Sequence, residues 1–287
     1  MAASAFVLPK GSLNPRYFAA EREPKRLFSP VSVSRDRLIR TVVGLRPYRS
    51  EGFVIKAERM GEKLLIHNYG HGGAGVTLSW RAATLAVEHA RDAQQNRFAV
   101  LGSGVMGLSV ARLLQQRGGT VTIYAKDLPP DTTSNVAGAL WYPSSSYNSQ
   151  KVSTAFLEQF RLACRISNRA FQELVGDQYG VRWVETFELQ QELAPLEPEP
   201  PGGARLYPET KILREPKRYF GFPYVRQFST MLIEPPVYMN QRAFSFRAAV
   251  APFGIFFCFL FACTLTCCLP SAAILTCFGL LIVTGTL

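Results

Sequence analysis

One stretch near the middle of the chain has the clearest pattern of hydrophobic and polar positions. Residues 97–101 form a short apolar run, as in a buried strand. Apolar positions over residues 105–117 return with a helical period, and residues 120–124 are again β-branched and aromatic. The pattern therefore predicts a strand, a helix and a second strand. Gly118 and Gly119 would end the helix, because glycine accepts the left-handed conformation common at helix C-termini.

The turn between the first strand and the helix carries glycines in the spacing G-x-G-x-x-G. Gly102 permits a tight turn, Gly104 lets the backbone approach a pyrophosphate, and Gly107 lets the helix pack closely on the sheet. The helix N-terminus offers free N–H groups to that anion. The position between a strand and a helix favours a dinucleotide site over a glycine turn without a ligand.

A second strand, glycine loop and helix precede this unit. Residues 52–57 and 63–67 alternate as a hairpin around Met60 and Gly61. The sequence HNYGHGGAGVTLSW follows over residues 67–80, and its glycines indicate a backbone that another group approaches closely. Residues 76–90 are a predicted helix, so the glycine loop leads into a second helix N-terminus that can bind an anion.

Further elements are expected on both sides of these two units. A strand-like run precedes them at residues 38–43, and an amphipathic helix follows them at 151–176. The remaining predictions are strands at 181–184, 187–189 and 226–234, a proline-rich loop at 192–217, and a turn at Pro235 and Pro236 that enters a helix at Tyr238.

The amino-acid composition is that of a globular protein, with an excess of basic over acidic residues. Of 287 residues, 47% are hydrophobic and 18% charged, with a net charge of +11 and a pI of about 9.6. The excess lies early, because residues 1–60 hold twelve Lys and Arg against five Asp and Glu. No zinc-finger, RNA-recognition or basic-zipper pattern accompanies it, so solubility or targeting is favoured over nucleic-acid binding.

The two ends of the chain differ from its middle. Residues 1–33 are rich in proline and arginine and predict a disordered leader, with a transit peptide as an alternative. Residues 248–287 contain no charged side chain, and residues 255–283 are long enough to span a bilayer, although Pro270 interrupts them. Five of the six cysteines lie in this apolar tail, so neither a disulfide framework nor a metal site is expected.

Four motifs together resemble the D-amino-acid oxidase family, FAD enzymes of the glutathione-reductase-like fold. They are GLRPYR at 44–49, HNYGHGGAGVTLSW at 67–80, LGSGVMGLSVA at 101–111 and DTTSNVAGALWYP at 131–143. The resemblance implies an α/β fold, with a Rossmann-like FAD-binding domain, an incomplete antiparallel-sheet substrate domain and an apolar C-terminal tail.

The chain departs from the family's pattern in two ways. GLRP and HNYGHGG follow the substrate domain in the family but precede the dinucleotide motif here, so the chain looks circularly permuted, with residues 91–96 as the joint. Beyond Asn240 the uncharged tail replaces the rest of the substrate domain, which suggests a shifted frame or retained intron rather than a membrane anchor. The expected segments are 1–33 leader, 34–95 permuted C-terminal part, 96–247 FAD-binding and partial substrate domain, and 248–287 tail.

The resemblance implies that FAD is the cofactor. Residues implied around its adenosine and phosphates are Gly102, Gly104, Val105, Met106, Gly107, Lys126, Asp127, Thr132, Thr133 and Ser134. Those implied around its ring are Gly138, Ala139 and Leu140, and the loop residues Gly72, Gly73, Ala74, Gly75, Val76 and Thr77, whose N–H groups would face the pyrimidine end. The family favours glycine where Ala139 stands.

The implied substrate contacts are Arg46, which would pair with a carboxylate bidentately, and Gly73. No residue is assigned a catalytic role, because His67 and His71 are interpreted as structural hydrogen-bonding groups.

The implied reaction is oxidation of a D-amino acid at its α-carbon by FAD and oxygen, giving a 2-oxo acid, ammonia and hydrogen peroxide. The alternatives are a truncated, non-catalytic flavin-binding fragment and a membrane-anchored flavoprotein amine oxidoreductase. The expected partners are a small D-amino acid and oxygen without nucleic acid, and a membrane through residues 253–283 is an alternative. A cytoplasmic location is expected, with membrane association or an organelle as alternatives.

Overall fold

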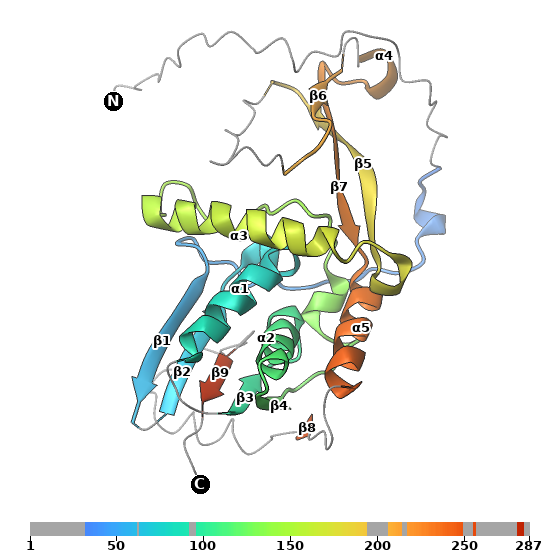
Figure 1. Cartoon of the computed structure of the whole chain (residues 1–287). Coiled ribbons are helices and arrows are strands. Elements are labelled where there is room, and N and C mark those ends of the chain that lie inside the picture. Colours follow the sequence, from blue (N-terminus) through green and yellow to red (C-terminus); the bar gives the residue numbers. More distant parts are fainter. Residues whose placement is uncertain are drawn as a thin grey trace. The chain divides into compact units, whose positions relative to one another are not determined.

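The computed structural model describes residues 32–61, 63–91, 96–193, 206–213, 217–248, 255–256 and 280–283. They divide into two compact units: the described residues up to Ile39 with those between Val184 and Thr230, and the larger Arg40–Trp183 with the described residues from Met231 onward. Helices and strands alternate through the larger unit, so the chain is an α/β protein (Figure 1).

A six-stranded sheet lies in the larger unit, in the order β1-β2-β9-β3-β4-β8. The strands are β1 (Val54–Met60), β2 (Lys63–Tyr69), β3 (Arg97–Leu101), β4 (Thr120–Tyr124), β8 (Ile255–Phe256) and β9 (Leu280–Val283). β1 and β2 form the predicted antiparallel hairpin, with Met60 opposite Lys63, and both strands extend further than expected. The hairpin prediction is therefore confirmed.

The predicted strand–helix–strand unit is confirmed as β3, α2 (Val105–Gln116) and β4, and the two strands are parallel. Its helix ends at the expected glycines. Gly118 has φ of +84°, its N–H donates to the Gln115 carbonyl at 2.9 Å, and the Gly119 N–H donates to the Leu114 carbonyl at 3.0 Å. This is a Schellman ending, in which glycine tolerates the left-handed backbone.

Four residues of the apolar tail form a strand that was not expected. β9 pairs antiparallel with both β2 and β3, so these two strands run in the same direction on either side of it. The apolar segment 255–283, for which a membrane span was one alternative, lies largely outside the described residues. Among those that are described, no helix is long and apolar enough to cross a membrane.

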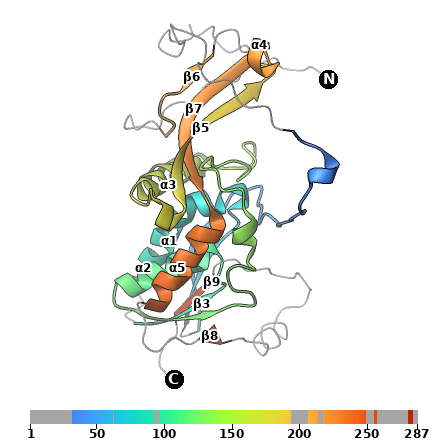
Figure 2. The same ribbon diagram turned by 90° about the vertical axis from the view of Figure 1, so that its right-hand side faces the viewer.

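Helices α1 (Gly75–His89), α3 (Thr154–Gln172) and α5 (Pro235–Ala248) complete the larger unit. α1 packs between α2 and α3, and its fully buried alanines, Ala82, Ala83 and Ala86, permit close approach. α5 packs on α2 (Figure 2) and starts at Pro235, where a proline needs no intrahelical N–H partner.

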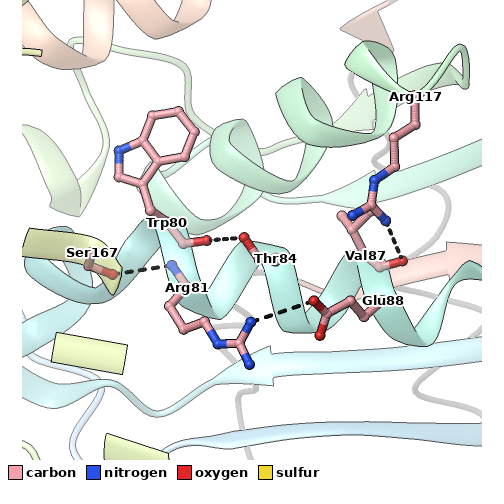
Figure 3. A network of polar contacts seen from close by, with 7 residues as sticks. All are labelled: Trp80, Arg81, Thr84, Val87, Glu88, Arg117 and Ser167. Atoms are coloured by element: carbon pink, nitrogen blue, oxygen red, sulfur yellow. Dashed lines mark hydrogen bonds and ion pairs between the residues drawn. The ribbon is translucent and has the colours of Figure 1, made fainter. Parts of the chain in front are cut away.

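Polar contacts join α1 to its neighbours along its length (Figure 3). The Arg81 N–H donates to the Ser167 hydroxyl of α3 at 3.2 Å, and the Arg81 side chain pairs with Glu88 within α1 itself at 3.5 Å. Arg117, at the end of α2, donates to the Val87 carbonyl at 3.4 Å. These contacts hold α1 in place, so its N-terminus has a defined position.

Most of a three-stranded sheet, in the order β5-β7-β6, belongs to the smaller unit. Its strands are β5 (Val181–Gln190), β6 (Lys211–Ile212) and β7 (Tyr224–Ile233), with a short helix α4 (Lys217–Phe220). The expected pair of strands at 181–184 and 187–189 is wrong, because β5 is continuous. Glu185, in the expected break, accepts a hydrogen bond from Gln227 of β7, and Glu188 pairs with Arg226 at 3.3 Å.

The strand expected at residues 38–43 is also wrong. These residues have no regular structure and are exposed, and the Ile39 side chain is 96% accessible. β-branched residues favour a strand only when a neighbouring strand satisfies their backbone groups. No such pairing is present in the described part of the chain.

Candidate cofactor site

A cavity of about 480 Å³ lies within the larger unit, and all four motifs contribute to it. Its volume is in the range of small-molecule sites. It is lined by residues 44–47, 70–73, 75–77, 104–107, 133–134, 136–140, 142 and 144. Segments far apart in the sequence therefore meet at one place, as when Gly44 packs against the Val136 side chain.

The N-terminus of α2 forms one wall of the cavity. Gly102 turns the chain with φ of +99°, and a methyl group on Gly107 would overlap the Gly102 carbonyl. The Val105 N–H donates to the Ser134 hydroxyl oxygen at 3.0 Å, while Gly104 provides no side-chain cap. The N–H groups of Met106 and Gly107 have no partner inside the helix, and both residues line the cavity.

The N-terminus of α1 forms the facing wall. The N–H groups of Gly72, Gly73 and Ala74 donate to the carbonyls of Pro47, Ser145 and His71 at 3.0, 3.1 and 3.0 Å. These residues form a 3₁₀ turn, Gly72–Ala74, that runs directly into α1 at Gly75. Gly75, Val76 and Thr77 follow in the first turn of α1 and line the cavity.

Arg46 lies beside this glycine loop. A methyl group on Gly73 would lie 3.1 Å from the Arg46 Nη1 atom and 2.6 Å from the Ser144 carbonyl oxygen. Among the described residues that line the cavity, Arg46 is the one that carries a charge. A guanidinium here gives the cavity a fork-shaped site for one carboxylate.

Neither candidate histidine provides a charge to the cavity. His71 lines it but is 2% exposed and stacks on Phe53 with ring centroids 4.8 Å apart. Burial lowers the pKa of His71 from 6.5 to about 3, so its ring is neutral at ordinary pH. His67 lies on β2 outside the lining, and its Nε2 atom is 3.1 Å from the Glu58 carboxylate.

The predicted site residues separate into two groups. Gly104–Gly107, Thr133, Ser134, Gly138–Leu140 and most of the glycine loop line the cavity, whereas Gly102, Ala74, Lys126, Asp127 and Thr132 do not. The Thr132 hydroxyl instead donates to Asn135 at 2.7 Å, and the Asp127 carbonyl accepts from Ser103. The roles of Lys126 and Asp127 toward adenosine stay predictions.

Sequence reasoning did not assign Tyr142 and Ser144, which also line the cavity. Tyr142 stands inside the DTTSNVAGALWYP motif, so the motif could have suggested it. Ser144 lies beyond the motif and is placed by its contact with the glycine loop, for which the sequence holds no signal.

The motif content agrees with comparisons to known proteins. Residues 97–215 match the family model described as FAD dependent oxidoreductase. The resemblance to the D-amino-acid oxidase family is confirmed. A D-amino-acid oxidase of Rubrobacter xylanophilus is 39% identical over 103 residues, which are 36% of this chain and 29% of that protein.

Two further relatives match this chain over segments of different length. A D-amino-acid oxidase of Dictyostelium discoideum is 52% identical over 46 residues, 15% of this chain and 13% of that protein. A D-aspartate oxidase of Homo sapiens is 32% identical over 153 residues, 50% of this chain and 42% of that protein. The chain thus spans less than half of the length of the relatives it matches, and the permuted order of its motifs stays a prediction.

FAD is the cofactor of the matched family, and the residues present fit it. Two helix N-termini offer free N–H donors, and Thr133 and Ser134 add hydroxyls between them. A Cβ atom on Gly75 or Gly138 would meet nothing within 4 Å, so both walls leave open space for a ligand. These N–H and hydroxyl donors suit the anionic phosphate groups of FAD and the polar edge of its ring.

Proposed function

We propose that this protein is an FAD-dependent oxidoreductase that oxidises the CH–NH₂ group of D-amino acids, with oxygen as the electron acceptor. The observation that carries the proposal is the position of Arg46, against the glycine loop of a cavity that two helix N-termini border. The family match at residues 97–215 supports the cofactor. When bound, FAD supplies the two-electron oxidation.

The residues of α2 and its neighbouring loop would hold the phosphate groups. The Ser134 oxygen accepts from the Val105 N–H, so the hydroxyl hydrogen can point away from the helix toward a ligand oxygen. The N–H groups of Met106 and Gly107 and the positive end of the helix dipole add to this anion site.

The first turn of α1 would hold the polar edge of the ring. Its N–H groups at Gly75, Val76 and Thr77 are fixed by helical geometry, and the Thr77 hydroxyl donates to the Ala74 carbonyl at 3.0 Å. Donors that are already oriented favour negative charge on that edge without reorganisation.

Arg46 would hold the substrate carboxylate and so orient the α-carbon. A bidentate guanidinium fixes both the position and the plane of a carboxylate, which a lysine ammonium cannot do. The neutral ring of His71 places no second positive charge beside it. Orientation by Arg46 is therefore the chain's main contribution to the substrate step.

The test combines cofactor binding with turnover. After incubation with FAD and desalting, the full chain should retain flavin absorbance and release peroxide from D-alanine, D-aspartate or D-glutamate above a heat-killed control. Arg46→Lys should keep the flavin absorbance and lower kcat/KM by roughly a hundredfold, about 3 kcal/mol of transition-state stabilisation. A chain that retains no flavin would contradict the proposal.

A flavin-binding chain without turnover is the second candidate function. The observation in its favour is the extent of the match, which reaches at most 42% of the length of the relatives described above. Retained flavin with no peroxide from any of the three D-amino acids would favour it. A cytoplasmic location is part of the first proposal, and fractionation of the full chain tests it against membrane attachment.

A further inference from the structure

The segment from Ala139 to Ser145 carries unusual backbone angles at both ends. Among the described residues, the non-glycine positions with positive φ are Ala139 at +44°, Ser145 at +53° and Glu209 at +59°. A left-handed backbone is unfavourable for residues with a Cβ atom, and it persists only where surrounding contacts impose it. Leu140, Tyr142 and Ser144, between the first two positions, line the cavity.

Hydrogen bonds impose this conformation. The Ala139 carbonyl accepts from the Ile233 N–H at 3.0 Å, and the Trp141 N–H donates to the Met231 carbonyl at 2.7 Å. The Trp141 side chain is fully buried. The backbone around Ala139 is therefore held on the last residues of β7 and cannot swing its methyl group aside.

At the other end the segment is held by the glycine loop. The Ser145 carbonyl accepts from the Gly73 N–H at 3.1 Å. Ser145 does not line the cavity, whereas Ala139 does. The two positions therefore share the same backbone strain but differ in their access to a ligand.

We propose that Ala139 is a positioning residue whose methyl group limits how closely a flat ring can approach the wall formed by residues 138–140. The inference rests on the proposed function, because the ring is that of FAD. Glycine at this position would adopt φ of +44° without steric cost and keep both hydrogen bonds to β7. It would also remove the methyl group from the cavity wall.

The test uses the full chain, with FAD as the ligand. Without FAD, Ala139→Gly should raise Tm by about 2–4 °C, because glycine adopts the left-handed backbone without strain. Titration with FAD, followed by flavin fluorescence, should give a Kd that is about three- to tenfold lower.

Two matched variants separate strain from access. Ser145→Gly relieves the same kind of strain outside the cavity lining, so Tm should rise while the Kd for FAD stays constant. Ala137→Gly lies in the lining but has an ordinary φ of −68°, so its Tm should fall or stay constant.

A fall in Tm for Ala139→Gly would overturn the strain argument. A rise in Tm with an unchanged or higher Kd would overturn the role of the methyl group. If neither the parent chain nor any variant binds FAD, the proposed function fails and this inference with it, but the Tm series still reports the strain separately.

Discussion

Two helix N-termini border the same cavity and are built in opposite ways. At α1, backbone carbonyls accept from the three N–H groups before the helix, and no side chain caps it. At α2, a hydroxyl from a loop about thirty residues later in the sequence, that of Ser134, accepts from the first helical N–H group. The α1 wall is thus made by backbone geometry and the α2 wall partly by one side chain.

The difference determines what each wall tolerates. Where a glycine faces backbone atoms there is no room for a Cβ atom, as at Gly73, where it would lie 2.6 Å from the Ser144 carbonyl oxygen. A wall that depends on a side chain can lose that side chain and keep its shape. We therefore expect substitution of a glycine that faces backbone atoms to damage folding, and the Ser134 substitution to alter ligand binding more than folding.

The largest effect is expected at Gly107, the backbone-built part of the α2 wall. Gly107→Ala would place a methyl group against the Gly102 carbonyl, where both partners are backbone atoms. The unfolding free energy should fall by about 3 kcal/mol or more, measured by urea denaturation. Gly75→Ala is the control, because its Cβ would meet nothing within 4 Å. Equal stability of the two variants would contradict the comparison.

The next effect concerns His71, the buried titratable group on the α1 side. Its folded pKa of about 3 lies below its ordinary value of 6.5, so the unfolded chain binds more protons at acid pH. Its contribution to stability is complete above pH 6.5 and is lost as the pH falls toward 3. Between pH 6.5 and 5 the loss should be about 2 kcal/mol.

Unfolding curves at pH 7 and pH 5 measure this loss. His71→Gln should make the chain less sensitive to acid by that amount, because glutamine does not titrate. An unchanged slope for His71→Gln would show that burial of His71 is not the cause.

The smallest effect is expected at Ser134. Ser134→Ala removes the acceptor of the Val105 N–H and should cost about 1 kcal/mol of stability. The Kd for FAD should rise by about five- to tenfold, since a hydroxyl donor to the phosphates is lost. Ser109→Ala, on α2 itself, is the control, because its buried hydroxyl has no hydrogen-bond partner within the described residues. Equal Kd values for both variants would count against the role of Ser134.

Local patterns predicted most of the elements around the cavity. The glycine spacing and the change from period 2 to a helical period located β3, α2 and β4, and the alternation around Gly61 located β1 and β2. These signals are local because turns and helix ends depend on the backbone freedom of single residues. The same local reasoning failed at residues 38–43 and in β5, where the outcome depends on a neighbouring strand.

By itself, the sequence determined the two glycine-rich helix entries, the resemblance to an FAD-dependent family and the candidate residues on its motifs, because glycine spacing and hydrophobic period are properties of adjacent residues. Only the tertiary structure decided which donors stay free. Gly73 donates to Ser145, Val105 donates to Ser134, and β7 holds Ala139 at φ of +44°. Each of these depends on an acceptor or donor that lies far away in the chain, so only the folded backbone determines which groups remain for a ligand.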